Sequence, residues 1–284
     1  MIFFLPETQA PAILMLKARG IRRQTGGQNY YNDIDKRPES ATRLILTAMP
    51  KPIILLFTEP IIMAWSLYLI IIYAILYMDF EGYSLLFAND YYRFNLVQVG
   101  LALLPIGVGI VVAGASAPLQ LLDYKPHYQK AIKEGKPMAP PEYRLRPLMI
   151  GGFFVPIGVF WLAWTARPGV YWASPVLSGL PFGIGLLIVF LTSYQFLIDC
   201  YGPIAASALA SVTLARYVAA GGLVMVVRPM YMNLAYSNAA GEDIYAWPVS
   251  LLGFLSVVCL PIPFTLYFGL GRWLRKRSPN CVKF

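Results

Sequence analysis

The sequence predicts an all-helical membrane protein in which six transmembrane helices form a 3+3 inverted repeat. Three observations lead to this fold class. Of the 284 residues, 58% are hydrophobic and 13% are charged, whereas an ordinary soluble domain carries about 25% charged residues. The apolar residues gather in six long runs, and the basic residues gather at one end of those runs. Both features are typical of a multi-pass integral membrane protein.

Each of the six runs approaches or exceeds the length of about 20 residues that a helix needs to cross the hydrocarbon core. Glycine and proline recur inside them, which is typical of closely packed and kinked membrane helices. We divide the chain into the end of a preceding helix with a cytoplasmic linker (1–51), a bundle (52–271) and a basic cytoplasmic tail (272–284). The runs of the bundle are 53–77, 94–115, 148–166, 172–198, 203–227 and 248–270.

Lysine and arginine are distributed unevenly between the two ends of the runs. Eight precede the first run, six lie between the second and third, and five follow the sixth, which places 19 of the 23 on one side. Basic loops are retained in the cytoplasm, so both termini are expected there. We interpret the formal net charge of +9 as a result of this asymmetry rather than as a sign of nucleic-acid binding.

Loop lengths suggest how the runs are grouped. The long loop of the first three runs lies on the cytoplasmic side, whereas the long loop of the last three lies on the outer side. Three spans followed by three of opposite orientation form one half of many transporters. The cytoplasmic loop also contains an amphipathic stretch, 121–132, that we expect on the membrane surface.

Motifs for metal binding and catalysis are lacking in the sequence. The three cysteines, Cys200, Cys259 and Cys281, have no metal-binding spacing, and the single histidine, His127, lies in a loop. No HExxH motif or catalytic GxSxG motif is present. The sequence therefore predicts no cofactor, no metal and no enzyme activity, and it gives a membrane-embedded enzyme little support.

Charged residues inside the runs are candidates for function because a charge in hydrocarbon costs about 2.5–3.5 kcal/mol. Arg216 lies roughly 20 Å along the fifth run, either as a gate or coupling charge facing a cavity or as an arginine satisfied by backbone carbonyls or the outer interface. Glu59 lies about 9 Å into the first run, where it could bind a cationic substrate, pair with Lys51 or a loop arginine, or remain a hydrated structural carboxylate. Asp199 either caps the turn after the fourth run or pairs with basic loop residues.

A tight cytoplasmic turn, PEYRL, offers a second kind of role. Glu142, Arg144 and the nearby Arg146 could form ion pairs that hold the cytoplasmic face shut. The alternative is a solvated loop that only follows the charge asymmetry described above.

Several stretches, in their order along the chain, resemble the C-terminal half of the major facilitator superfamily. The likeness is closest to the fungal drug:proton antiporters, which include polyamine and multidrug exporters. The stretches that carry it are FLPETQAPAILMLKARGIRRQTG (4–26), EPIIMAWSLYLIIIYAILYMDF (59–80), PPEYRLRP (140–147), PIGVFWLAWTARPGVYW (156–172), IDCYGPIAASALASVTLAR (198–216) and PIPFTLYFGLGRWLRKRS (261–278).

The resemblance implies a proton-coupled exporter of drugs, polyamines or similar small organic molecules, located in the plasma membrane. Its partners would be the lipid bilayer, the small organic substrate, protons, and either a separate N-terminal half or a second copy of the chain. Aromatic faces attract organic cations. The residues on spans that line the cavity in such relatives correspond to Tyr68, Tyr73, Tyr77, Gln98, Tyr194 and Gln195.

Two departures from the family pattern affect this interpretation. The family has twelve helices and this sequence has six runs, so we expect the chain not to transport without a second bundle. The alternative is a truncated membrane protein without transport activity, or a gene-model fragment. In addition, LVMVVRPMY (223–231) replaces the aromatic and proline-rich end of helix eleven, and a polar insertion, 237–243, follows it.

Overall fold

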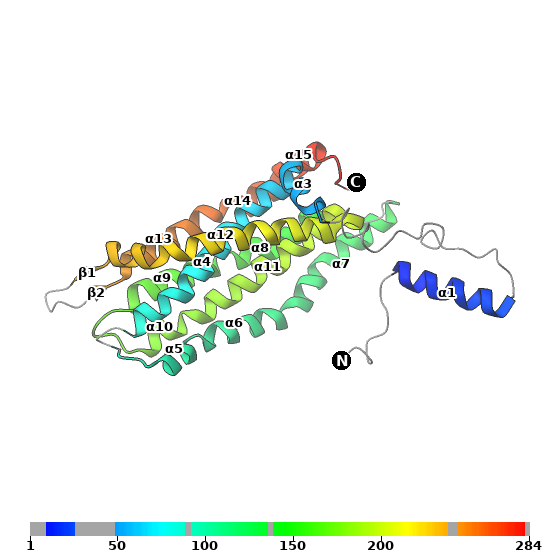
Figure 1. Cartoon of the computed structure of the whole chain (residues 1–284). Coiled ribbons are helices and arrows are strands. Elements are labelled where there is room, and N and C mark those ends of the chain that lie inside the picture. Colours follow the sequence, from blue (N-terminus) through cyan, green and yellow to red (C-terminus); the bar gives the residue numbers. More distant parts are fainter. Residues whose placement is uncertain (1–9, 26–48, 89–91, 136–138, 238–242, 282–284) are drawn as a thin grey trace. The chain divides into compact units, whose positions relative to one another are not determined.

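The computed structural model describes residues 10–25, 49–88, 92–135, 139–237 and 243–281 of the chain (Figure 1). The chain divides into two units, Met1–Pro50 and Lys51–Phe284. The first unit contributes one described helix, α1 (Ala10–Thr25), whose last turn carries Arg22 and Arg23. Basic residues at that end are favoured because the C-terminus of a helix bears a partial negative charge. The expected linker after α1 lies largely outside the described residues.

The second unit consists almost wholly of helices, which confirms the all-helical part of the predicted fold class. Among the described residues, five stretches are long and apolar enough to cross a membrane, and they make the chain an integral membrane protein. One of them, Ala173–Leu234, has 62 residues and would measure about 90 Å as a single helix. It is divided at Gly202, whose positive φ of 42° suits a residue without a Cβ. The stretches are Pro60–Phe87, Leu96–Lys133, Pro141–Thr165, Ala173–Leu234 and Ala246–Arg277.

The first predicted run forms two helices rather than one, α3 (Lys51–Thr58) and α4 (Pro60–Phe87). The break falls at Glu59, which has extended backbone angles, because a proline disfavours helical geometry in the residue before it. At its other end α4 continues past Tyr77, where the predicted run stops, to Phe87.

Most of the remaining runs are likewise built from shorter helices that meet at prolines, glycines and bends, whereas the fifth is almost wholly one helix, α12. The amphipathic stretch predicted in the cytoplasmic loop is part of a helix, α7. In chain order the elements are α5 (Leu96–Ala102), α6 (Leu104–Ala115), α7 (Ala117–Lys133), the 3₁₀ turn η1 (Pro141–Leu145), α8 (Arg146–Gly151), α9 (Phe154–Thr165), α10 (Ala173–Leu177), α11 (Gly179–Tyr201), the 3₁₀ turn η2 (Gly202–Ile204), α12 (Ala205–Leu234), α13 (Ala246–Cys259), α14 (Pro261–Thr265), the π-type segment η3 (Leu266–Leu270) and α15 (Gly271–Arg277).

A short hairpin follows α12 at the end of the bundle that carries few basic residues. Its strands, β1 (Tyr236–Ser237) and β2 (Asp243–Ile244), pair antiparallel with Tyr236 opposite Ile244. The hairpin contains both ends of the polar insertion noted in the sequence, and residues 238–242 of that insertion lie outside the described part.

Close helix packing depends on small residues, as the sequence indicated. α4 packs along α12, and α11 packs against α6 and α9. A Cβ atom at Gly109 of α6 or at Gly183 of α11 would collide with the backbone of the opposite helix. Tyr231 of α12 packs directly on Gly82 of α4 in the same way. These contacts hold α11 against α6 and α12 against α4.

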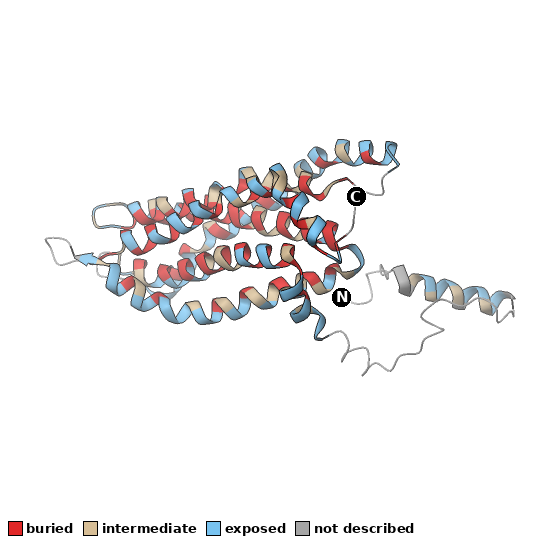
Figure 2. Ribbon diagram, turned by 90° about the horizontal axis from the view of Figure 1, so that it is seen from above, coloured by how far each residue is buried: buried red, intermediate tan, exposed pale blue. Residues whose placement is uncertain are grey.

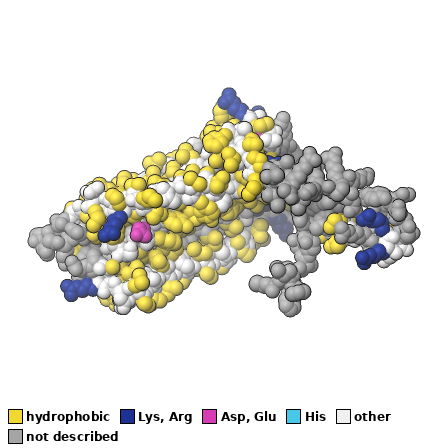
Figure 3. All heavy atoms as spheres, viewed as in Figure 1, with side chains coloured by type: hydrophobic (Ala, Val, Ile, Leu, Met, Phe, Trp, Pro, Cys, Tyr) yellow, Lys and Arg dark blue, Asp and Glu magenta, His cyan; other side chains and the backbone are white. Residues whose placement is uncertain are grey.

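Burial follows the inner faces of the helices (Figure 2), while the face of the bundle seen in Figure 3 is mainly hydrophobic with few charges. Large apolar side chains such as Leu67, Val111 and Met225 are exposed. In water such a surface would be unfavourable, whereas lipid tails are as apolar as the side chains themselves. The distribution therefore suits a bundle surrounded by hydrocarbon.

Candidate functional site

The turn η1 connects the helix ends at the basic side of the bundle through two buried ion pairs. Glu142 Oε1 lies 2.7 Å from Arg275 Nη2 of α15, and Arg144 Nε lies 2.8 Å from Asp199 Oδ2 of α11. Three of these four residues were candidates from the sequence, and their side chains are largely shielded from solvent. Shielded pairs are screened little by salt, and the loss of one partner leaves a buried charge behind.

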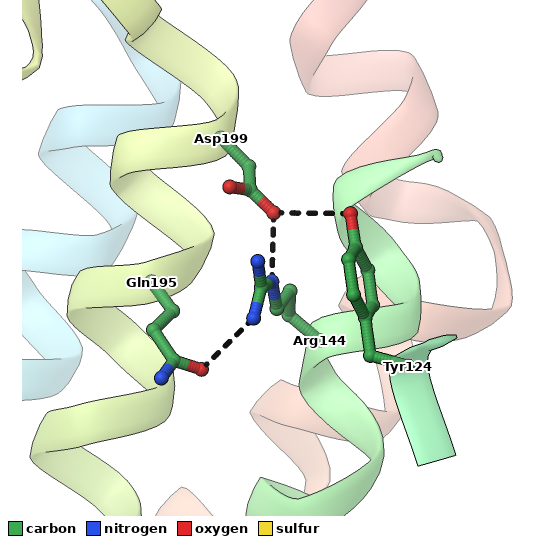
Figure 4. Close-up of polar contacts among 4 residues, drawn as sticks. All are labelled: Tyr124, Arg144, Gln195 and Asp199. Carbon is green, nitrogen blue, oxygen red and sulfur yellow. Dashed lines mark hydrogen bonds and ion pairs between the residues drawn. The ribbon is translucent and has the colours of Figure 1, made fainter. Parts of the chain in front are cut away.

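Arg144 makes further contacts around its ion pair (Figure 4). Its Nη1 donates to Gln195 Oε1 at 3.4 Å, and its guanidinium carbon lies 3.9 Å from the ring centre of Tyr124. The Tyr124 hydroxyl donates to Asp199 Oδ2 at 3.4 Å. Arg144 thus joins η1, α7 and α11 in one polar cluster, and Gln195 belongs to this cluster.

Arg146 forms a third, more exposed link. Its Nη1 lies 3.3 Å from Asp123 Oδ1 and 3.2 Å from His127 Nε2, and its Nε contacts the Tyr267 hydroxyl at 3.3 Å. The His127 ring stacks on Tyr143 with the ring centres 4.1 Å apart. Exposed ion pairs of this kind contribute about 0–1 kcal/mol to stability. The two shielded pairs therefore matter more for holding the helix ends together at this end of the bundle.

Glu59 is fully buried, at 0% exposure, between the start of α4 and the C-terminal segment. Its Oε1 accepts from the backbone N and the Nδ2 of Asn280, at 3.2 Å and 2.7 Å. Its Oε2 accepts from the Tyr201 hydroxyl at 3.2 Å. Lys51, which the sequence offered as a partner, forms no ion pair with it among the described residues. Glu59 therefore connects α4, the end of α11 and the tail.

Arg216 lies about 16 Å along α12, which measures about 45 Å, and it packs beside Tyr73, which lies halfway along α4. Its guanidinium carbon lies 4.8 Å from the ring centre of Tyr73, 5.1 Å from Phe190, 5.4 Å from Tyr194 and 5.0 Å from Tyr217. We call these four rings, from α4, α11 and α12, the Arg216 cage. Such cation–π contacts stabilise a cation that has left water.

The six predicted cavity residues do not come together in the structure. Tyr73 and Tyr194 belong to the Arg216 cage, and the Tyr77 hydroxyl lies 3.1 Å from that of Tyr73. Tyr68 instead is buried against Trp65. Gln98 forms a capping box with Asn95 at the start of α5, where it satisfies backbone groups.

Asp79 is a buried acidic residue that the sequence analysis did not select. It is 2% exposed, and its Oδ1 has no hydrogen-bond partner among the described residues. Tyr83 of the same helix and Tyr231 of α12 lie within electrostatic range of its carboxyl group. One feature of the sequence could have indicated this burial. Asp79 and Tyr83 follow Ile72 and Ile75 at helical spacing, so they continue the buried face of the helix past the end of the apolar run.

At the opposite end of the bundle from η1, Tyr92 holds the segment that follows α9. Its hydroxyl lies within hydrogen-bond distance of three backbone carbonyls, those of Thr165 at 3.3 Å, Arg167 at 3.4 Å and Val170 at 3.2 Å, and shares its one proton among them. Burial raises the pKa of Tyr92, and the hydrogen bond with the Arg167 backbone lowers it by less. The hydroxyl therefore stays protonated and remains a donor at neutral pH.

Within the described residues, no three His, Cys, Asp or Glu side chains gather closely enough to bind a metal ion. The polar groups instead form two layers, the ion-pair cluster with Glu59 at one end and the Arg216 cage at mid-depth. Asp79 lies farther along α4, beyond the cage. A charged group at these depths has a high free-energy cost unless it faces the protein interior or water, and such groups usually have a function.

The chain is similar to transporters over nearly its whole length. It is 42% identical over 281 residues to the uncharacterized transporter mfs2 of Schizosaccharomyces pombe, which covers 99% of this chain and 48% of that protein. It is 34% identical over 275 residues to the MFS-type transporter kojT of Aspergillus oryzae, covering 97% and 47%. The identity is 36% over 282 residues to the major facilitator superfamily multidrug transporter mdrA of Aspergillus fumigatus, covering 99% and 44%.

The chain therefore spans about half the length of the curated relatives it matches. No family model matches it, and no solved structure matches it. The relatives are named as transporters of the major facilitator superfamily, multidrug transporters among them. They support the resemblance drawn from the motifs. The subtype and the substrate do not follow from these names and have to be argued from the chemistry of the residues.

Proposed function

We propose that the chain is the C-terminal half of a proton-coupled exporter of small, drug-like organic molecules, of the major facilitator type. The observation that carries the proposal is Arg216, a charged residue at mid-depth of a bundle whose relatives transport solutes. Substrate sites of secondary transporters lie near the bilayer midplane. Catalysis has no part in this function.

In this proposal the bundle has six transmembrane helices, because α11 and α12 each cross the membrane. They form two inverted groups of three, with both termini in the cytoplasm and the protein in the plasma membrane. The placement of 19 of 23 basic residues at one end supports this orientation. The linker 1–51 and the tail 272–284 then lie on the cytoplasmic side.

The cluster around η1 has the properties of a cytoplasmic gate. Glu142–Arg275 and Arg144–Asp199 join helix ends that must separate when a cavity opens inward. Glu59 adds a contact between α4 and the tail. We assign these residues to closing the cytoplasmic side, since rocking of one bundle against another must break and remake such pairs.

Proton coupling requires a carboxyl group that can lose its proton inside the bundle. Asp79 is the residue we assign to this role, because no ion pair between described residues involves it and its Oδ1 lacks a partner. The groups facing it are Tyr83 on its own helix and Tyr231 on α12. Intramembrane carboxyl groups of this kind form proton relays in transporters.

A complete transport cycle requires a second bundle against which this one moves. The partner is either a separate N-terminal half or a second copy of the chain. The alternative function is a membrane protein that does not transport, whether a truncated product or a gene-model fragment. The two functions predict opposite results in a flux measurement.

The test is a fusion of the chain behind the N-terminal half of the fission yeast relative mfs2, reconstituted in vesicles with an imposed proton gradient. We expect the fusion to move either the cationic dye rhodamine 6G or the anionic dye fluorescein against its gradient, and the chain alone to move neither. A fusion that assembles but moves neither dye would favour the non-transporting alternative.

A further inference from the structure

The Arg216 cage lacks a negative charge. None of the described residues forms an ion pair with Arg216, and its Nε is buried without a hydrogen-bond partner. Along α4, the residue of the cage is Tyr73, and the nearest buried acid is Asp79, about 9 Å farther along the helix. The Tyr217 hydroxyl hydrogen-bonds to the Arg216 side chain, so among the described residues the guanidinium is met by aromatic rings and a neutral hydroxyl rather than by a carboxylate.

Aromatic rings alone are a weak substitute for a counter-ion. A cation–π contact contributes about 0.5–2 kcal/mol, and an ionised hydrogen bond to a guanidinium is stronger and more directional. Arg216 therefore keeps hydrogen-bonding capacity that no carboxylate of the described residues fills. A bidentate acceptor such as a carboxylate matches the planar fork of an arginine.

The cage is accessible from one side. Arg216 itself is 8% exposed, whereas Tyr217 is 52% and Tyr77 is 38% exposed. Arg216 thus lies inside a ring of aromatic side chains, and two tyrosines beside it, Tyr77 and Tyr217, reach the surface of the bundle. A planar ligand that enters from this side can place its acidic group on Arg216 and stack its flat body on the Tyr77 ring.

We propose that the Arg216 cage binds the carboxylate of an aromatic or otherwise planar organic anion. This proposal rests on the proposed function for its claim that the bound anion is a transported substrate, and it narrows that substrate to organic acids. The Tyr77 ring, which lies outside the four that face Arg216, supplies stacking, and Arg216 supplies the charge.

The same geometry disfavours a polyamine or another organic cation at this position. Aromatic rings attract cations, but here the faces of four rings are already directed at the Arg216 guanidinium. A second cation would meet like-charge repulsion in a medium of low dielectric. The cage therefore disfavours organic cations, although its tyrosine rings alone would attract them.

Equilibrium binding to the full-length chain in lipid nanodiscs tests the site without requiring transport. The probes are benzoate, benzamide and benzylamine at neutral pH, which share a ring and differ in charge. We expect benzoate to bind about tenfold or more tightly than benzylamine, with benzamide between them, because a hydrogen bond to a charged group is worth about 1.5–3 kcal/mol.

Three variants assign the effect to the cage. Arg216→Gln should remove the preference for benzoate, and Arg216→Lys should retain part of it because the charge remains. Arg228→Gln is the matched control, since it removes an exposed arginine from the same helix outside the cage, and it should bind all three probes as the unmodified chain does. Size-exclusion profiles establish that each variant is folded.

Equal or tighter binding of benzylamine by the unmodified chain would overturn the proposal. So would the absence of binding by all three probes, or an equal loss of benzoate binding in Arg228→Gln. Because binding is measured at equilibrium, a failed flux assay leaves this result intact, and a failed binding assay leaves the flux result intact. The two proposals can therefore fail separately.

Discussion

Arg144 and Asp199 form a shielded ion pair, with Nε and Oδ2 2.8 Å apart, that joins η1 to the end of α11. The pair lies among the side chains of Tyr124 and Gln195 (Figure 4). Residues 55 positions apart in the chain thus meet at the end of the bundle that carries most of the basic residues. Several measurable consequences depend on this and the related contacts.

Removing one partner of this pair should destabilise the bundle. Asp199→Ala leaves the Arg144 guanidinium without its carboxylate, and the cost for a shielded pair is about 3–5 kcal/mol. The double variant Arg144→Met/Asp199→Leu should lose less than Asp199→Ala alone, because no uncompensated charge remains. Thermal unfolding of the purified chain in detergent measures both. Equal loss in the single and double variants would contradict the coupling.

The tail should detach when Glu59 is changed. Glu59→Ala removes the acceptor of both Asn280 bonds and of the Tyr201 bond, so the segment around the exposed Arg277 loses its anchor and enters the active site of trypsin more readily. We expect faster C-terminal cleavage in limited proteolysis, followed by mass spectrometry. Glu81→Ala, an exposed acid on the same helix, is the control and should be cleaved at the original rate.

Two glycines of α6 should respond differently to the same substitution. Gly109→Ala places a Cβ against the backbone of α11, and overpacking of this kind costs about 1–3 kcal/mol. Gly107 has no atom within 4 Å of a Cβ built there, so Gly107→Ala should unfold at the original temperature or slightly above it. A similar loss for both variants would mean that the α6–α11 contact is not the cause.

Asp79→Asn should separate transport from proton coupling in the fusion protein. The amide has nearly the same shape as the carboxyl group and cannot release a proton at the pH of the assay. We expect flux that no longer depends on the pH difference across the membrane, with thermal stability unchanged or raised because a buried acid is removed. Glu81→Gln serves as the control. A pH dependence that survives in Asp79→Asn would exclude Asp79 from coupling.

The contribution of Tyr92 to the stability of the folded chain should decrease at alkaline pH. Burial raises the pKa of Tyr92 in the folded chain, so its stabilising contribution is present below the unfolded value of about 10. That contribution is lost as the pH rises through the folded pKa. Tyr92→Phe should therefore unfold more easily than the original chain at neutral pH, by about 0.5–1.5 kcal/mol, and the difference should shrink at high pH.

Much of the architecture could be predicted from the sequence because hydropathy and charge act locally along the chain. The apolar runs locate the helices that can cross a membrane, and Arg216 and Glu59 stand out within them. The runs also contain Pro60, which breaks the first of them in the structure, and Gly202, which divides Ala173–Leu234. These features depend on the properties of single residues and their immediate neighbours.

The sequence by itself determined a helical membrane bundle with its basic residues on one side, because a bilayer selects for length, apolarity and charge placement. Only the tertiary structure decided which side chains contact one another and which are buried. Glu59 meets Asn280 across 221 positions, Gln98 caps a helix, and Asp79 is buried although an apolar run ends before it. The physical reason is that burial and ion pairing depend on which helix faces pack together, and a one-dimensional pattern does not contain that information.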